Sequence, residues 1–385
     1  MPKLLKVFTK HRSAWLIAIV VFFLRAGQFM TMPFFAIYLT KAHVLTASQI
    51  GVVLGIAALM MSGTGFINGL FIDKNCFKKV LYWGLLLTAI CYVSFIFFVN
   101  YFLSLMILNA CMGWLRSLME ISAMSILVSD VSAKELSLAY SMRFIGANLG
   151  VAIGPVIGAA MAMHNALNIF IVAGLINAFL AAIIYFYQVP PRSVNQAEPL
   201  KALANLKKIL KDKMLLNMTF INFLLWTAYS QMDTTFPQYL TKYFEHSAIF
   251  FSQLMIVNAG ICVLFQTAIL RWAQRHSLKV FGMIGSAMFA SAFILLAFNA
   301  NHLGFFISIM IMSFAELFTL PINGLMVMTQ APKESIASYG GILNLGLLGL
   351  FIGPTLGGLG LDFLGGTRLF LLMSILPVYA ILRYR

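Results

Sequence analysis

The sequence has little charge for its length. Only 10% of its 385 residues are charged, with 26 Lys and Arg against 11 Asp and Glu, whereas 61% are hydrophobic. Soluble domains carry about 25% charged and roughly 45–50% apolar residues, so the composition excludes an ordinary water-soluble fold. Because a membrane span needs about 20 predominantly apolar residues, most of this chain can lie in lipid. The sequence therefore predicts an integral membrane protein.

Cysteine and histidine are also scarce. The four cysteines form no C-x-x-C motif, which argues against both a zinc site and a disulfide framework. The six histidines all fall in loops or at the ends of apolar runs, so a buried histidine proton relay is not expected. No G-x-x-x-x-G-K-[ST] loop is present, which disfavours a self-contained ATP-driven pump. We expect no metal, no cofactor and no enzymatic activity.

Long apolar runs are what the sequence has in abundance. Twelve runs exceed the 9–11 residues of a membrane strand, and none alternates apolar with polar residues. They predict an all-α membrane protein with twelve transmembrane helices at 14–39, 49–71, 80–99, 102–128, 136–163, 167–187, 215–240, 250–272, 280–300, 303–328, 336–363 and 368–385. The first run is longer than a signal-peptide core and lacks a small-residue cleavage site, so we expect it to be retained.

Basic residues are distributed unequally between the two sides of these predicted helices. The side that carries the N-terminus has 20 of the 26 Lys and Arg, and the other side has 3. The positive-inside rule then places both termini in the cytoplasm, with the chain in the inner (plasma) membrane. The formal net charge of +15 therefore needs no nucleic-acid partner to explain it.

The longest connection, residues 188–214, separates the first six predicted helices from the last six. It begins with Pro190 and Pro191 and continues as LKALANLKKILKDKM. Its apolar residues recur at spacings of three and four, with lysines elsewhere on the wheel, which is typical of an amphipathic helix on an anionic membrane surface. A surface linker between two halves is favoured over a regulatory element.

One string of residues occurs twice in the chain. The pattern K-E-x-x-x-x-Y, followed by G-x-x-x-G-P-x-x-G, runs from Lys134 to Gly158 and recurs 199 residues later, from Lys333 to Gly357. Seven identities in one register predict two six-helix halves of common origin, 1–187 and 215–385. Because each half has an even number of spans, both share one orientation, which is the parallel-repeat arrangement.

On these features the sequence resembles the major facilitator superfamily, and within it the drug:proton antiporter branch, over nearly its whole length. The family signature between helices 2 and 3 is matched at Gly69, Asp73, Lys74 and Lys78, while Cys76 and Phe77 depart from it. The helix-5 signature of the antiporter branch is matched at Gly150, Gly154, Pro155 and Gly158, and its repeat copy supplies Gly353, Pro354 and Gly357. The arginine that the branch carries early in helix 4 is absent, and Asn109 stands there.

The resemblance implies that the signature residues form a conformational gate or hinge, and we add Arg143 to them as a gate candidate. Glycines four residues apart let helices approach closely, and proline frees a carbonyl, so close packing is an equally good explanation of the helix-5 motif. The resemblance also implies that Asp73 latches onto the start of predicted helix 11, near Ser335 to Tyr339. For Arg143, snorkelling to the interface remains an alternative to a gate contact.

Six charged residues lie well inside predicted spans: Arg25, Arg116, Glu120, Arg143, Asp233 and Glu316. Each would cost about 2.5–3.5 kcal/mol at the centre of a lipid-facing helix, so all six must face protein or a water-filled cavity. All except Arg143 lie on helices 1, 4, 7 and 10, which the resemblance implies line a central cavity. The candidate substrate contacts on these helices are Arg25, Gln28, Arg116, Asn222, Trp226, Tyr229 and Asn323.

The three embedded carboxylates are the candidates for proton coupling. Glu120 lies four residues after Arg116, so we expect the two to form an ion pair that keeps Glu120 ionised. Glu316 lies nearer its helix midpoint than Asp233 does, and no basic residue lies within four positions of either. We therefore expect Glu316 to be the principal proton carrier and Asp233 the second, with Arg25 as their alternating counter-ion.

These observations predict a secondary active transporter that works by alternating access, most simply the proton-coupled export of a small, partly apolar organic compound. Uptake of an organic metabolite by symport and a lipid or glycolipid flippase remain alternatives, and a transport-dead sensor is a more distant one. The expected partners are a small-molecule substrate, protons and membrane lipids. We expect the chain to act as a monomer.

Overall fold

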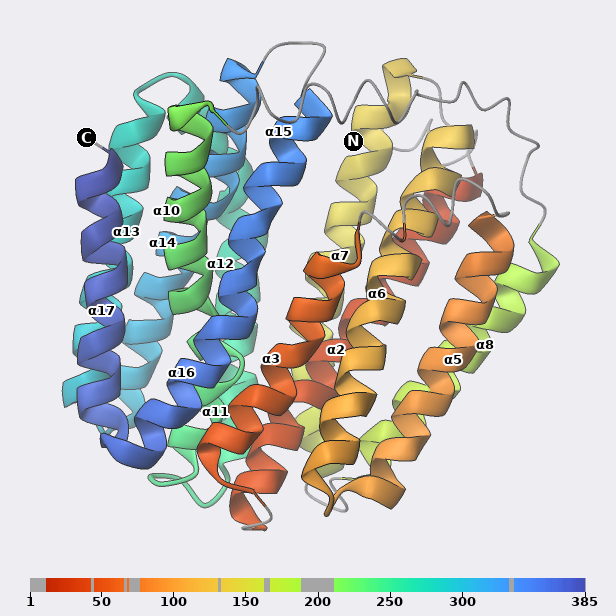
Figure 1. Cartoon of the computed structure of the whole chain (residues 1–385), viewed down its shortest axis with the longest axis horizontal. Coiled ribbons are helices and arrows are strands. Elements are labelled where there is room, and N and C mark those ends of the chain that lie inside the picture. The colour runs from red at the N-terminus through yellow and green to blue at the C-terminus, as the bar shows by residue number, and fades with distance from the viewer. Residues whose placement is uncertain are drawn as a thin grey trace. The chain divides into compact units, whose positions relative to one another are not determined.

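The computed structural model describes residues 12–42, 45–65, 68, 77–130, 133–162, 167–187, 211–331 and 336–384, and these residues form helices and connecting turns without a strand. The all-α prediction is therefore confirmed. In the first part of the chain the helices are α2 (Arg12–Lys41), α3 (Ala47–Gly63), α5 (Phe77–Phe98), α6 (Phe102–Asp130), α7 (Ala133–Ala162) and α8 (Asn168–Phe186) (Figure 1).

The second part contains two predicted helices that are interrupted. Range 215–240 divides into α10 (Lys213–Tyr229), the 3₁₀ turn η1 (Ser230–Met232) and α11 (Thr235–Leu240). Range 336–363 divides into α15 (Ile336–Leu343), the 3₁₀ turn η3 (Asn344–Leu348) and α16 (Gly349–Phe363). The remaining helices are α12 (Ser247–Gln274), α13 (Leu278–Phe298), α14 (His302–Gln330) and α17 (Gly365–Tyr384).

Within the described residues, ten helical stretches are long and apolar enough to cross a membrane. Two of the twelve predicted ranges are not among these ten stretches. Helix α3 has 17 residues (Ala47–Gly63) and part of range 49–71 lies outside the described residues, whereas range 215–240 is broken at η1. The structure therefore supports a multi-pass helical membrane protein, while the count of twelve spans remains a prediction.

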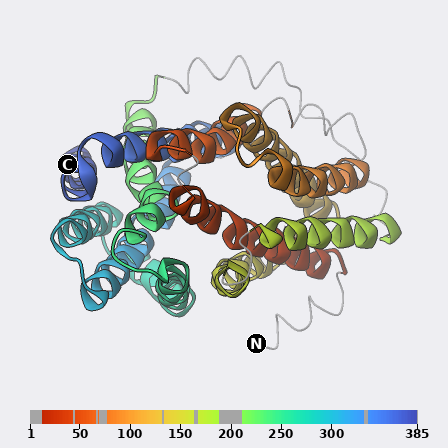
Figure 2. The ribbon, with the colours of Figure 1, turned by 90° about the horizontal axis from the view of Figure 1, so that it is seen from below.

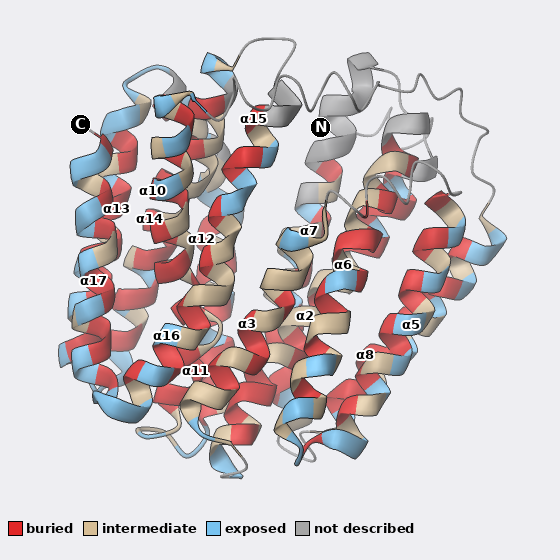
Figure 3. Cartoon of the chain, viewed as in Figure 1, coloured by how far each residue is buried: buried red, intermediate tan, exposed pale blue. Residues whose placement is uncertain are grey.

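Large apolar residues are exposed on many helices. Exposed residues are pale blue in Figure 3. On α8, for example, Leu175, Phe179 and Phe186 expose 64%, 62% and 80% of their surface. In water such continuous apolar surface would drive association, whereas beside lipid chains it needs no cover. The exposed faces therefore agree with the predicted membrane location.

The chain divides into two compact units whose boundaries differ from those of the two predicted halves. Unit 1 comprises residues 1–45, 56–193 and 244–259, and unit 2 comprises residues 46–55, 194–243 and 260–385. Helices α3 and α12 each contribute to both units. The sequence-based division into 1–187, 188–214 and 215–385 stays a prediction, and most of the predicted linker lies outside the described residues.

Unit 1 is built around α2, which packs along α7, and around α5, which packs against both α6 and α8 (Figures 1 and 2). The glycines of the helix-5 motif face the backbone of α2. A Cβ atom added to Gly150 would lie 2.3 Å from the carbonyl oxygen of Phe22, and one added to Gly154 would lie 2.6 Å from that of Ala26. The motif therefore brings the two helix backbones into direct contact.

Unit 2 repeats this packing with the second copy of the motif. α10 packs against α16 and α17, and α13 packs against α14 and α17. A Cβ added to Gly353 would lie 2.5 Å from the carbonyl oxygen of Thr227 and 1.9 Å from Oγ of Ser230. The side-chain amide of Gln231 in η1 donates to the Gly353 carbonyl at 2.8 Å. The glycine motif thus positions the interrupted helix of unit 2.

Candidate functional site

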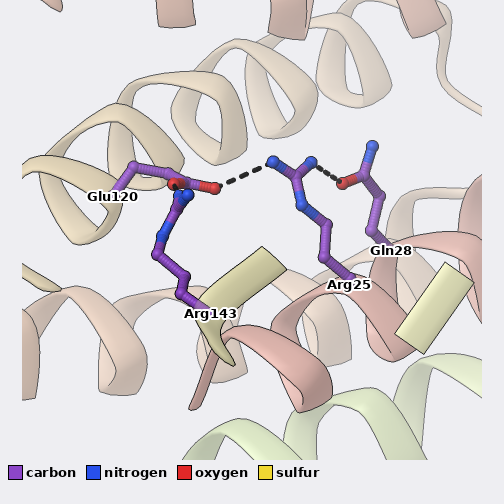
Figure 4. Close-up of polar contacts among 4 residues, drawn as sticks. All are labelled: Arg25, Gln28, Glu120 and Arg143. Carbon is purple, nitrogen blue, oxygen red and sulfur yellow. Dashed lines mark hydrogen bonds and ion pairs between the residues drawn. The ribbon is translucent and has the colours of Figure 1, made fainter. Parts of the chain in front are cut away.

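In unit 1, the embedded charges gather around one carboxylate (Figure 4). Arg25 on α2 donates from Nη2 to Oε1 of Glu120 at 2.9 Å, and Arg143 on α7 donates to Oε2 of the same residue. Arg25 also donates from Nη1 to Oε1 of Gln28 at 3.1 Å. Three helices, α2, α6 and α7, therefore meet at Glu120, and ion pairs between different helices hold them there.

Arg116 is not the ion-pair partner of Glu120 in this structure. Both carboxylate oxygens are occupied by guanidinium groups from other helices, and no described carboxylate lies within 4.0 Å of Arg116. The expected pair between Arg116 and Glu120 is therefore wrong here. Helical spacing places the two residues on one stripe of α6, but the carboxylate turns toward Arg25 and Arg143, which face it from neighbouring helices.

Arg25 and Arg116 line one pocket, partly open, within unit 1. Its other lining residues are polar or apolar and come from α2, α5 and α6: Leu24, Gln28, Thr88, Tyr92, Met112, Met119 and Glu120. The predicted substrate residues Arg25, Gln28 and Arg116 thus meet at one place. Arg25 is bound to Glu120, so the counter-ion contact predicted for it with Asp233 or Glu316 is not seen in this structure.

In unit 2, two embedded carboxylates lie near each other at the break in the predicted seventh helix. Asp233 follows η1 directly, and its charge interacts with that of Glu316 on α14. Oδ1 of Asp233 is buried and has no hydrogen-bond partner among the described residues. Glu316 accepts from the Cys262 thiol at 3.7 Å and is hydrogen-bonded to Tyr229. The two acids therefore share a polar site within one unit.

The remaining predicted substrate residues also lie in unit 2. Trp226 and Tyr229 form an edge-to-face pair with ring centroids 5.4 Å apart. Asn323 donates to Oδ1 of Asn222 at 3.3 Å and accepts a hydrogen bond from the Tyr384 hydroxyl. Both asparagines are buried, so this contact joins α10, α14 and α17 inside the unit. Sequence reasoning missed Tyr384, because it lies at the very end of a predicted span.

The predicted gate residues are only partly covered by the structure. Gly69, Asp73, Lys74 and the proposed latch position at Ser335 lie outside the described residues, so the latch stays a prediction. Lys78 lies half-buried in the first turn of α5. Pro155 and Pro354 lie within α7 and α16, beside the packing glycines. Arg143 forms an ion pair with Glu120 in this structure, and its predicted role as a gate residue stays a prediction.

Sequence reasoning missed a carboxylate that caps α3. Asp362 on α16 accepts from the backbone N–H groups of Ala47 and Ser48, at 3.0 and 2.7 Å. Thr46 and Gln49 complete the cap by exchanging backbone and side-chain hydrogen bonds. The Thr-x-x-Gln capping box is a recognisable sequence signal for this helix start, whereas the contribution of Asp362 has none.

A second missed contact joins Asp212 and Tyr339, both in unit 2. Asp212 caps α10 by accepting from the backbone N–H groups of Met214 and Leu215, and the Tyr339 hydroxyl donates to its other oxygen at 2.7 Å. The hydroxyl of Tyr339, more than the two backbone groups, lowers the pKa of Asp212 below its ordinary value. Tyr339 belongs to the repeated string, so the repeat marks a residue that ties α15 to α10.

Comparison with known proteins gives consistent matches. The model of the Major Facilitator Superfamily matches residues 17–347. The uncharacterized MFS-type transporter YqjV of Bacillus subtilis is 24% identical over 375 residues, covering 95% of this chain and 90% of that protein. A Na(+), Li(+), K(+)/H(+) antiporter of Planococcus maritimus is 21% identical over 366 residues, covering 87% and 86%.

Solved structures show the same architecture. The crystal structure of a point mutant of the nucleoside transporter NupG superposes with a TM-score of 0.81 over 97% of this chain and 99% of that chain, at 14% identity. At this identity the likeness extends to the fold alone.

Proposed function

The chain belongs to the Major Facilitator Superfamily, and from that membership we propose that it exports a small, partly apolar organic compound in exchange for protons. It is a transport protein of a secondary-transporter family rather than an enzyme. Exchange would proceed by rocking of two six-helix halves, 1–187 against 215–385, in the inner membrane with both termini in the cytoplasm. Protons are the proposed coupling ion, and no bound cofactor is required.

The acidic site of unit 2 is the observation that carries the proposed coupling. Asp233 presents a buried carboxylate oxygen without a hydrogen-bond partner among the described residues, next to the charge of Glu316. Two neighbouring carboxylates cannot both stay ionised in an apolar surrounding without cost, so proton uptake relieves their repulsion. The site also lies at a helix break, where transporters place their ion sites.

Glu316 is the proposed principal proton carrier, and Asp233 the second. Glu120 has a different part, because two guanidinium groups hold its carboxylate and it organises the basic pocket of unit 1. The expectation from sequence that Glu120 also takes part in coupling is not retained in the proposal. Arg25 would exchange partners only if the transport cycle released it from Glu120.

The test uses purified protein in liposomes with an imposed pH gradient and a panel of organic compounds. Glu316→Gln should abolish gradient-driven transport, whereas exchange of substrate without a gradient should continue. Glu245→Gln, which changes an exposed glutamate, is the matched control and should transport like the unmodified protein. If Glu316→Gln still showed gradient-driven transport with an unchanged pH dependence, Glu316 would not be the principal proton carrier. Asp233 would then be the candidate for that role. The direction of proton movement relative to substrate separates export by antiport from uptake by symport.

A second candidate function is the exchange of a monovalent metal cation for protons. The acidic pair Asp233 and Glu316 favours it, as does the similarity to the Planococcus maritimus antiporter. The same liposomes test it when Na⁺, Li⁺ or K⁺ replaces the organic compounds. Proton efflux driven by one of these cations, and lost in Glu316→Gln, would support the second candidate over the first.

A further inference from the structure

The six embedded charges are segregated by sign between the two units. Unit 1 holds Arg25, Arg116 and Arg143 with Glu120, and unit 2 holds Asp233 and Glu316. Summed over the whole chain these formal charges cancel, so composition alone favours no ligand charge. Taken unit by unit they do not cancel, because unit 1 has three guanidinium groups around a single carboxylate.

Glu120 makes its ion pairs with Arg25 and Arg143 and makes none with Arg116. Its Oε1 receives Arg25 and its Oε2 receives Arg143, so both oxygens are already in ion pairs. Among the residues that the structure describes, no other carboxylate lies within ion-pair distance of any of the three arginines. Arg116 nevertheless lines the pocket beside Arg25, half-buried among apolar side chains. A cation in such surroundings is stabilised by an anion that enters from solution.

We infer that the pocket of unit 1 binds the carboxylate group of a small organic anion, with Arg116 as its principal contact. The inference rests on the proposed transport function and names its substrate class. A guanidinium group presents parallel N–H donors that match the two oxygens of a carboxylate. The side-chain oxygen of Gln28 accepts from Arg25, so the N–H groups of the same amide can donate to the ligand.

The apolar lining of the pocket argues for an organic anion over an inorganic one. Leu24, Met112 and Met119 line it alongside the arginines, and the ring of Tyr92 adds a further apolar face. An inorganic phosphate has no apolar atoms to pack against these side chains. The pocket has a free volume of about 20 Å³ in this structure, so it must widen to admit such a ligand. In the widened pocket the carboxylate of an organic acid would meet Arg116 and its carbon atoms would meet the methionines.

Binding is tested on purified protein in detergent, without a pH gradient, by titrating ligands against its thermal unfolding temperature. The probes are benzoate, phenylacetate and hexanoate, each alongside the amide and the amine of the same carbon skeleton, together with inorganic phosphate. At least one acid should raise the unfolding temperature saturably at micromolar to millimolar concentration, and the matched amide, amine and phosphate should not.

Three variants connect that binding to the pocket. Arg116→Gln should weaken binding of the acid by at least about tenfold, because a charge-assisted contact is lost. Arg116→Lys keeps the positive charge but loses the planar guanidinium group, so it should bind the acid with intermediate affinity. If Arg116→Gln does not fold, Arg116→Lys tests the inference in its place. Lys79→Gln removes a positive charge from an exposed position on α5 and should bind like the unmodified protein.

Several results would overturn the inference. These are stabilisation by amines or amides equal to that by acids, equal stabilisation by phosphate, no stabilisation by any of the acids, or unchanged affinity in Arg116→Gln. Because no gradient is present, these outcomes leave the coupling proposal untouched. Conversely, a protein that binds organic acids but moves no protons would contradict the proposed coupling alone.

Discussion

The helix pair α2–α7 in unit 1 and the pair α10–α16 in unit 2 use the same glycine motif but differ in continuity and charge. α2 runs unbroken beside Gly150 and Gly154, whereas the counterpart of α2 is interrupted at η1 beside Gly353. The unbroken pair carries Arg25 and Arg143, and the interrupted one carries Asp233. The repeat therefore preserved the packing while the chemistry of the two copies diverged.

This difference suggests that the two units have different roles. In unit 1, ion pairs between helices fix the cluster, because Glu120 is held from two sides. In unit 2, a buried oxygen of Asp233 is left without a described hydrogen-bond partner beside a helix break. A carboxylate held by two arginines is suited to holding helices and orienting a ligand, whereas an incompletely satisfied acid is suited to gaining and losing a proton.

The largest expected effect comes from breaking the ion-pair cluster of unit 1. Glu120→Gln leaves two guanidinium groups without a counter-charge and should lower the free energy of unfolding by about 3 kcal/mol, near the lower end for buried pairs. The lower end applies because 24% of the Glu120 side chain is exposed. Chemical unfolding in detergent micelles measures the change.

Glu316→Gln is the matched control in unit 2. It removes one of two neighbouring like charges while keeping a hydrogen-bond acceptor, so its cost should stay below about 1 kcal/mol. Equal destabilisation by the two substitutions would contradict the contrast between the units. A double-mutant cycle refines the result, because Glu120 should couple to Arg143 by about 1 kcal/mol or more and to Arg116 by less.

Glycine replacement tests whether the two motif copies really pack alike. Gly154→Ala and Gly353→Ala each place a methyl group within 2.6 Å of a backbone carbonyl oxygen on the facing helix. Both should destabilise the protein by about 1–3 kcal/mol through overpacking. Gly324→Ala on α14, where an added Cβ meets nothing within 4 Å, is the control. A neutral result at only one of the two sites would show that the copies no longer share their packing.

Removal of the Asp362 cap should affect the segment of α3 that belongs to unit 2. Asp362→Ala leaves the N–H groups of Ala47 and Ser48 without their acceptor, at an expected cost of about 1 kcal/mol. Hydrogen exchange should accelerate at Ala47 and Ser48 and remain slow near Ala57, in the part of α3 that belongs to unit 1. Uniform exchange along α3 would mean that the cap does not act locally.

The smallest expected effect is the pH dependence of the Asp212–Tyr339 contact. The hydroxyl of Tyr339 holds the pKa of Asp212 below its unfolded value of about 3.9, so the contact stabilises the fold above that pH. The contribution disappears as the pH falls through the lower folded pKa. Tyr339→Phe should therefore be slightly less stable near neutral pH and equally stable in acid. A difference that grows in acid would contradict the assignment.

The helices, the repeat and the embedded charges could be predicted from the sequence, because each is a pattern along the chain. Apolar runs gave the helix positions, and the repeated glycines marked the two close helix contacts later found in both units. The charge partners could not be predicted in this way. Glu120 pairs with residues 95 and 23 positions away, whereas helical spacing had indicated Arg116, four positions away.

The same limit explains the other differences. Asp362 caps a helix that begins 315 residues earlier, and no local pattern records that contact. The 3₁₀ interruptions also depend on neighbours, because Gln231 in η1 bonds to the Gly353 carbonyl of another helix. Local sequence indicates which residues are embedded, but the packing of helices decides which of them meet.

The central claim is that protons are taken up by the acids of unit 2 while the carboxylate of unit 1 stays with its arginines. Infrared difference spectroscopy of the protein during a pH titration tests it directly, because a protonated carboxyl group has its own C=O band. Between about pH 5 and 8, where exposed Asp and Glu stay ionised, the account predicts a pH-dependent carboxyl band in the unmodified protein and in Glu120→Gln. This band is lost when Asp233→Asn and Glu316→Gln are combined. A band that survives the combined substitution and disappears in Glu120→Gln would contradict the account.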